Sequence, residues 1–156
     1  MVLLGKIYQA GLRVRIEPND SKEVDLYDFE ARTHMRVFPA DRIYFTSALS
    51  DAKIIKASLE GWIPPPARFR VSKTFLREGQ FKDGAGRLYF YQYKKKGGNL
   101  YALRWVTADR EERLLRIIYP GSANETIIVD YDRIKTTKLS SDYFRPPADF
   151  LSLNPF

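Results

Sequence analysis

The chain has 156 residues, of which 44% are hydrophobic and 29% are charged, and these proportions are typical of a globular protein with a sizeable core. It has no cysteine and one histidine, which excludes disulfide scaffolds, cysteine nucleophiles and zinc sites of the Cys/His type. The formal net charge of +7 favours an anionic or acidic partner, but the basic residues are spread along the chain and form one run only, at residues 94–96.

The beginning of the chain, MVLLGKIYQ, lacks the apolar region that a signal peptide needs. No apolar run in the sequence reaches the roughly 18–20 residues of a membrane span. We therefore expect no transmembrane segment in this chain.

The first part of the chain predicts short strands at the spacing of an antiparallel meander. In LRVRIE, residues 12–17, apolar and charged residues alternate with period two, so one face of the strand is dry and the other is wet. Turn-forming segments such as PNDSKE separate this strand from its neighbours. The predicted strands are residues 2–9, 12–17, 24–29, 34–38 and 42–45.

Residues 48–60, ALSDAKIIKASLE, break this pattern and predict one helix, because their apolar residues recur at helical spacing. Ser50 and Asp51 are candidate N-caps. Gly61 can end the helix, and the prolines at 64–66 prevent it from continuing.

The rest of the chain returns to strands, with glycine-bearing turns at residues 83–86 and 95–99 and an irregular tail at 138–150. These strands are residues 69–79, 87–94, 100–108, 113–119 and 126–132. The pattern predicts an α+β fold, mostly β, dominated by a single curved antiparallel sheet. A helix of some 12 residues is only about 18 Å long, so apolar surface on the concave side should remain uncovered.

The catalytic candidates are few. His34 lies inside a predicted strand without a cysteine or a nucleophile motif nearby, which favours a structural or surface role. The nearest carboxylate pairs are Asp25 with Asp28 and Asp130 with Asp132, and their strands favour surface charges opposite Arg or Lys on the next strand. We therefore expect no catalytic residue, no cofactor and no metal ligand.

Aromatic residues are concentrated in one predicted hairpin. Tyr89, Tyr91 and Tyr93 share one face of the first strand, and Tyr101 and Trp105 share a face of the second. Beside the lysines at 94–96, this arrangement suggests a stacking platform for single-stranded nucleic acid. Cross-strand packing of aromatic side chains within a sheet is the interpretation that we favour.

Three stretches, taken in order, carry a resemblance to a known family: GKIYQAGLRVRIE (5–17), VDLYDFEARTHMRVFPADRIYF (24–45) and RLLRIIYP…TIIVDYDRIKTTKLSSDYFRPPADF (113–150). Together they resemble the LolA/LolB-like superfamily of bacterial envelope proteins. The resemblance implies an unclosed β-barrel with one or two helices on its concave side. It also implies an apolar space for acyl chains of lipids or lipoproteins, and a location in the periplasm. Family members usually begin with a leader and an amphipathic helix, so we expect residues 1–156 to be a single LolA-like domain without them.

The resemblance and the strand alternation together predict an apolar ligand-binding surface on the concave face. Its predicted residues are Leu12, Val14, Ile16, Val24, Leu26, Leu103, Trp105, Ile117, Ile127 and Val129. The expected function is a non-enzymatic periplasmic carrier or binding protein for lipid, acyl chains or lipoproteins, with an envelope protein as a further partner. The alternative is a basic, β-rich module for nucleic acid or an acidic protein, of which nucleic acid is the disfavoured partner.

Overall fold

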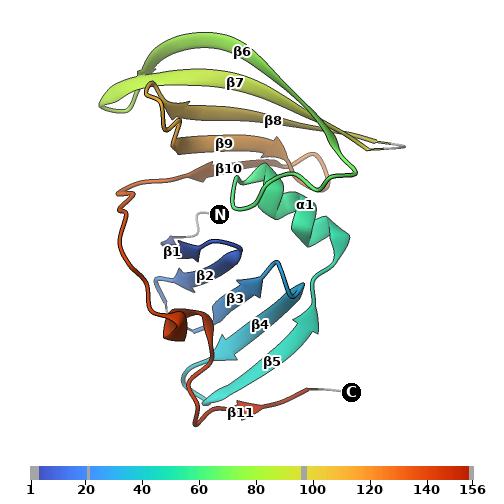
Figure 1. The fold of residues 1–156 in the computed structure, drawn as a ribbon, viewed down its shortest axis with the longest axis vertical. Helices are drawn as coiled ribbons and strands as arrows, with labels where there is room; N and C mark the ends of the chain where they lie inside the picture. The colour runs from blue at the N-terminus through green and yellow to red at the C-terminus, as the bar shows by residue number, and fades with distance from the viewer. Residues whose placement is uncertain (1–3, 21, 96–97, 155–156) are drawn as a thin grey trace. The chain divides into compact units, whose positions relative to one another are not determined.

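The computed structural model describes residues 4–20, 22–95 and 98–154 (Figure 1). Within these ranges the chain forms eleven strands, one α-helix and one 3₁₀-helix, which confirms the α+β, mostly β prediction. The strands form two separate sheets, so the prediction of a single continuous sheet is wrong. The chain divides into two compact units, Met1–Ile54 with Thr137–Phe156 and Ile55–Thr136, and each is described by itself. The assignment of residues 1–156 to a LolA-like domain stays a prediction.

The first unit contains a six-stranded sheet in the order β1-β2-β3-β4-β5-β11. Neighbouring strands are antiparallel, except that β11 runs parallel to β5. The five predicted strands of this region are found within a few residues of their predicted ends, although residues 2 and 3 lie outside the described ranges. The strands are β1 (Gly5–Ala10), β2 (Arg13–Pro18), β3 (Val24–Asp28), β4 (Thr33–Phe38), β5 (Ile43–Ala48) and β11 (Leu151–Ser152).

The two faces of the first sheet bury different side chains. One face, called the groove face below, carries the buried cluster Val24, Leu26 and Val37, against which Phe150 packs. The opposite face carries Val14, which has no exposed surface. Cross-strand partners share a face, so the register decides which residues lie together.

The α-helix α1 spans Asp51–Leu59, as the sequence predicts. Ser50 is its N-cap, because its side-chain Oγ accepts a hydrogen bond from the backbone N–H of Lys53 at 3.3 Å. At the other end, Gly61 has a φ of 80°, and the N–H of Trp62 donates to the carbonyl oxygen of Ala57 at 2.9 Å. A glycine in the left-handed region followed by this bond is a common helix C-cap.

The second unit contains a five-stranded antiparallel sheet in the order β10-β9-β8-β7-β6. The predicted turn at 83–86 is displaced, because β7 already begins at Gly84, and part of the predicted turn at 95–99 (residues 96 and 97) lies outside the described ranges. The strands are β6 (Arg70–Phe81), β7 (Gly84–Lys95), β8 (Gly98–Thr107), β9 (Leu114–Pro120) and β10 (Thr126–Asp130).

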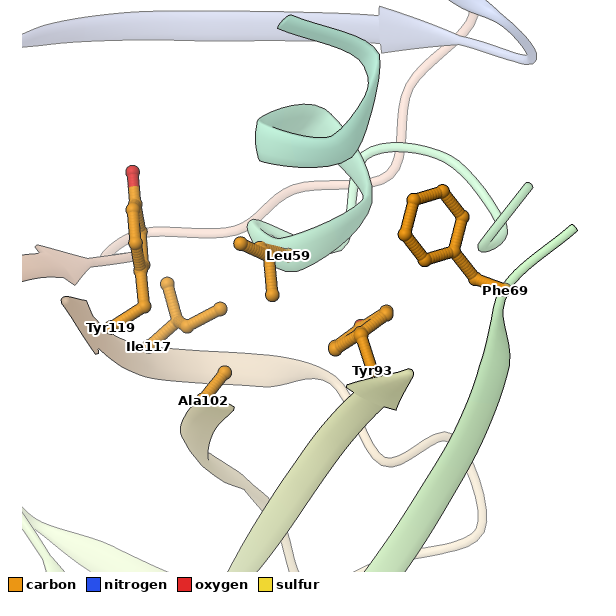
Figure 2. Packing of buried hydrophobic residues seen from close by; sticks show 6 residues of the cluster. All are labelled: Leu59, Phe69, Tyr93, Ala102, Ile117 and Tyr119. Carbon is orange, nitrogen blue, oxygen red and sulfur yellow. The ribbon is translucent and has the colours of Figure 1, made fainter. Parts of the chain in front are cut away.

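One face of the second sheet, called the inner face below, forms a core with the end of α1. Figure 2 shows Leu59 of the helix among side chains from several strands and from the segment before β6. The opposite face of this sheet, which carries Phe90, Leu103 and Ile118, is called the outer face. The core cluster consists of Leu59, Phe69, Tyr93, Ala102, Ile117 and Tyr119.

Two polar side chains, those of the half-buried Arg104 and the buried Tyr119, fix the end of α1 over the inner face. The Arg104 Nη2 atom lies 2.6 Å from the carbonyl oxygen of Ser58, 2.8 Å from that of Leu59 and 2.7 Å from the hydroxyl of Tyr93. The Tyr119 hydroxyl donates to Oε1 of the buried Glu60 at 2.5 Å. Carbonyl groups at a helix C-terminus lack partners within the helix, so a guanidinium group supplies the donors that they need.

The tail that follows β10 returns to the first sheet. It contains the 3₁₀-helix η1 (Ser141–Phe144), capped by Ser140, and ends in β11. The N–H of Leu151 donates to the carbonyl oxygen of Arg42, and that of Leu153 donates to the carbonyl oxygen of Tyr44. No helix within residues 4–20, 22–95 and 98–154 is long and apolar enough to cross a membrane.

Candidate functional site

The strongest candidate site is an open groove of about 790 Å³ in the first unit, between the groove face of the sheet and residues 142–150. The lining is mainly valine, proline, alanine and phenylalanine, with three charged side chains. The lining residues are Arg15, Val24, Val37, Pro39, Asp142, Arg145, Pro146, Pro147, Ala148 and Phe150.

The sheet supplies the floor of the groove. Val24 and Val37 are cross-strand partners on β3 and β4, and both are at least 95% buried. Arg15 of β2 lies on the same face, because it is the cross-strand partner of Leu26. The residues of β2 that the sequence predicts to face water therefore share a face with the apolar residues of β3.

The tail supplies the other wall. Pro146 and Pro147 have no backbone N–H, so they line the groove with ring carbons and leave no unsatisfied donor there. Phe150 packs on the buried valine and leucine side chains of the sheet, and its N–H donates to the carbonyl oxygen of Pro147 at 3.0 Å. The wall is therefore apolar and is held to the sheet close to the groove.

Two guanidinium groups belong to the lining of the groove. The Nε of Arg15 donates to Glu17 Oε1 at 2.6 Å, and its Nη1 donates to the carbonyl oxygen of Tyr143 at 2.9 Å. Arg145 donates to the carboxylate of Asp142 through Nη2. Seven of the ten lining residues are apolar and Asp142 is the one carboxylate among them, so the groove offers a mainly apolar surface for binding.

The ten predicted site residues are not brought together, because they are divided between the two sheets. In the first unit, Val24 and Leu26 lie on the groove face, whereas Val14 and Ile16 lie on the opposite face, since Val14 pairs with Tyr27. Leu12 lies in the turn between β1 and β2 and is 39% exposed. Of the ten, only Val24 lines the groove.

In the second unit the other five predicted residues are also divided between two faces. Ile117 pairs with Val129, and together with Ile127 they lie on the inner face, where Ile117 is fully buried in the core. Leu103 and Trp105 lie on the outer face, because Leu103 pairs with Ile118 and not with Ile117. These side chains therefore do not form one apolar surface.

The sequence reasoning missed the residues of the tail wall. The segment RPPADF reads as an irregular tail, and its return to the first sheet is a non-local event that no local pattern encodes. The available signal is the pair of prolines followed by Phe150, because an aromatic residue is a candidate for burial.

The hairpin of β7 and β8, which carries the tyrosines, contributes to the core of the second unit. Tyr93 is 2% exposed and belongs to the core, and the ammonium group of Lys73 lies 4.0 Å from the centre of the Tyr89 ring. Tyr101 and Trp105 lie on the opposite face of the sheet. The described part of this hairpin therefore supports aromatic packing, whereas Lys96 of the predicted basic run lies outside the described residues.

His34 has a structural setting, as expected. It is 3% exposed, and its ring stacks on Tyr27 with the ring centres 4.4 Å apart. Its Nδ1 lies 3.3 Å from the Lys53 ammonium, which can only donate, so Nε2 carries the hydrogen that reaches Asp25 at 2.7 Å. Burial raises the pKa of Asp25, but the hydrogen bond from His34 and the charge of Arg36 outweigh this effect, so the net pKa is lowered.

Three of the candidate carboxylates are paired with arginines, as predicted. Asp28 and Asp130 lie opposite Arg13 and Arg116 in the strand register, with closest ion-pair distances of 3.4 Å and 2.5 Å. Asp25 likewise lies opposite an arginine of β4. Asp28 and Asp130 agree with the predicted pairing to an arginine on the next strand, whereas the half-buried Asp25 also binds the buried His34.

No protein-family model and no curated protein sequence matches this chain. The resemblance to LolA/LolB-like proteins therefore stays a prediction, and the function has to be argued from the groove itself.

Proposed function

We propose that the protein is a non-enzymatic binding or carrier protein that holds an acyl chain, of a lipid or a lipoprotein, in the groove of its first unit. The observation that supports this proposal is the apolar lining, to which Val24, Val37, Pro146, Pro147 and Phe150 contribute. Its volume of about 790 Å³ falls within the range of roughly 300–1,000 Å³ typical of small-molecule sites.

The hydrophobic effect would supply most of the affinity. Each methylene group that moves from water into an apolar site contributes about 0.8 kcal/mol. A chain lying along the valine floor and the proline wall needs no catalytic group, which agrees with the lining. Affinity should therefore rise with chain length until the groove is full.

The arginines suggest the orientation of the ligand. Arg15 and Arg145 would attract a carboxylate or phosphate head group, which would compete with Glu17 and Asp142 for the same donors. The periplasmic location and an envelope partner that delivers or receives the ligand belong to this proposal through the LolA/LolB-like resemblance.

The test is a titration of delipidated protein with a fluorescent fatty acid and, separately, with an acylated lipopeptide. Ala148 lines the groove and is exposed, so Ala148→Phe should fill the space without disturbing the core. We expect saturable binding to the natural sequence and binding at least about tenfold weaker to the variant, because several methylene groups lose contact.

Ala31→Phe is the matched control, since Ala31 is exposed in the first unit and does not line the groove. It should bind like the natural sequence. Binding that does not saturate, or equal affinity of the two phenylalanine variants, would contradict the proposal.

A further inference from the structure

The outer face of the second sheet carries a continuous row of apolar side chains. The cross-strand partners Phe90 and Leu103, Leu103 and Ile118, and Ile118 and Ile128 place one apolar residue from each of four strands side by side. With their neighbours on the same face, the set is Leu88, Phe90, Tyr101, Leu103, Ile118 and Ile128.

None of these six residues belongs to the buried core of the second unit. Ile128 is 55% exposed and Tyr101 is 41% exposed, and the other four are half-buried, chiefly against neighbours in the sheet. An antiparallel sheet that buries one face normally has a polar second face. A contiguous apolar patch of this kind marks an interaction surface.

One end of the outer face holds two guanidinium groups over aromatic rings. Trp105 stacks on Phe81 at 5.3 Å, with Arg77 over the indole at 5.1 Å and Arg116 over the Phe81 ring at 5.1 Å. A Cβ on Gly86 would lie 3.2 Å from the Trp105 ring, so this glycine gives the indole room to lie against the strand. The geometry presents cations at the border of the apolar row.

The opposite end of the face is also basic. Arg70 and Lys94 are cross-strand partners on β6 and β7, both are exposed, and they share the outer face with Phe90. Four basic side chains therefore border the row, whereas Asp130 is the one acidic side chain in the paired outer-face positions of the described strands, and it is bound to Arg116.

We infer that the outer face docks on the surface of a lipid bilayer that contains anionic lipids. An apolar and aromatic centre with a basic border matches the boundary between acyl chains and anionic head groups. A second copy of the same face would bring like charges together, which opposes self-association. Four of the six side chains in the row are leucine or isoleucine, which offer neither base-edge donors nor a stacking surface, and this disfavours nucleic acid.

The test is flotation of the full chain with vesicles of phosphatidylcholine alone and of phosphatidylcholine mixed with phosphatidylglycerol. We expect binding to the anionic vesicles only, weakened by salt. The double variant Arg70→Glu with Lys94→Glu should lower the partition coefficient by about tenfold or more, since each basic residue near an anionic surface contributes several-fold. Ile128→Gln should lower it without a change in charge.

The matched control is Arg110→Glu with Lys135→Glu, which changes the net charge equally at exposed positions outside the five strands. Its partition should fall by less than about twofold, because screened charges away from the contact act weakly. Ala148→Phe should bind vesicles like the natural sequence, which separates this inference from ligand uptake by the groove.

Three results would overturn the inference. One is the absence of binding to anionic vesicles. Another is equal loss of binding in the outer-face and control variants. The third is evidence for a different occupant of the outer face in the absence of vesicle binding. This would be a concentration-dependent dimer, or salt-sensitive binding to single-stranded RNA, and the outer-face variants would abolish it.

Discussion

The two sheets are built from similar alternating strands, but they differ in what covers them. The first sheet has strands of five or six residues in its main body, and the tail returns over its groove face with Phe150 as the anchor. The second sheet has strands of up to 12 residues, and the end of α1 covers its inner face. Its outer face keeps exposed apolar residues, so the two sheets differ both in strand length and in the segments that cover their faces.

Each unit also has a polar side chain that connects a strand to the helix. In the first unit, His34 connects Asp25 of the neighbouring strand to Lys53 of the helix. In the second unit, Arg104 connects its strand to the end of the helix through carbonyl oxygens. Each unit therefore has a polar side chain, His34 in the first and Arg104 in the second, whose removal should loosen that unit first.

The largest effect is expected for Arg104→Ala. The carbonyl oxygens of Ser58 and Leu59 and the hydroxyl of Tyr93 would lose a charged donor inside the core, at a cost of about 3 kcal/mol in the free energy of unfolding. Urea denaturation measures the total, and amide hydrogen exchange should lose protection in β7 to β9 while β2 to β5 keep theirs. Loss of protection shared equally by both sheets would contradict a local role.

The next largest effect is expected for His34→Ala, and it should be confined to the first unit. The substitution leaves a cavity beside Tyr27 and removes the partner of Asp25, which should cost about 2 kcal/mol. Exchange should now increase in β2 to β5 and not in β7 to β9. Lys53→Ala, which removes only the longer contact at 3.3 Å, is the control and should cost well below half as much.

Local signals in the sequence predicted the elements well, whereas the grouping of faces required the structure. Ser50 caps the beginning of the helix and Gly61 follows its end, as expected, because capping depends on residues within one turn. Alternation divides a strand into two faces, but it does not say which face of the next strand lies beside them, and a shift of one residue reverses the assignment. Val14 and Leu26, predicted to share a face, are therefore on opposite faces.

The candidate site was less predictable than the fold for a related reason. Its floor residue Val24 follows from alternation, but the wall depends on a tail that joins the sheet more than 100 positions later in the sequence. No period or cap encodes such a contact. Likewise, nothing local indicates that the strands before and after α1 belong to different sheets.

A smaller effect, dependent on pH, is expected for Glu60→Gln in the second unit. Burial raises the pKa of Glu60 above 4.5, although the hydrogen bond from Tyr119 and the charge of Lys56 lower it. The folded state then holds a proton that the unfolded chain releases, so this group makes the protein less stable as the pH rises above 4.5. Below that pH both states are protonated, and the contribution disappears.

The variant should therefore gain stability relative to the natural sequence as the pH rises from 4 to 7, because it has no carboxyl group to ionise in the buried site. Urea denaturation at several pH values measures this difference, and Tyr119→Phe is a control that keeps the carboxyl group. A difference in stability that is constant with pH would show that Glu60 has an ordinary pKa.

The smallest effect on stability is expected for Asp130→Asn, which also tests the outer face. The hydrogen bond from Arg116 holds the pKa of Asp130 below 3.8, so the pair stabilises the protein above that pH and is lost as the pH falls further. Both side chains are about one-third exposed, so the cost at neutral pH should be about 0.5 kcal/mol or less. Because Arg116 keeps its place over the Phe81 ring, the variant gains a free cation at the border of the apolar row. Its partition onto anionic vesicles should therefore rise several-fold, while its thermal stability scarcely changes. A fall in vesicle binding would mean that Asp130, and not the cation beside it, contacts the partner.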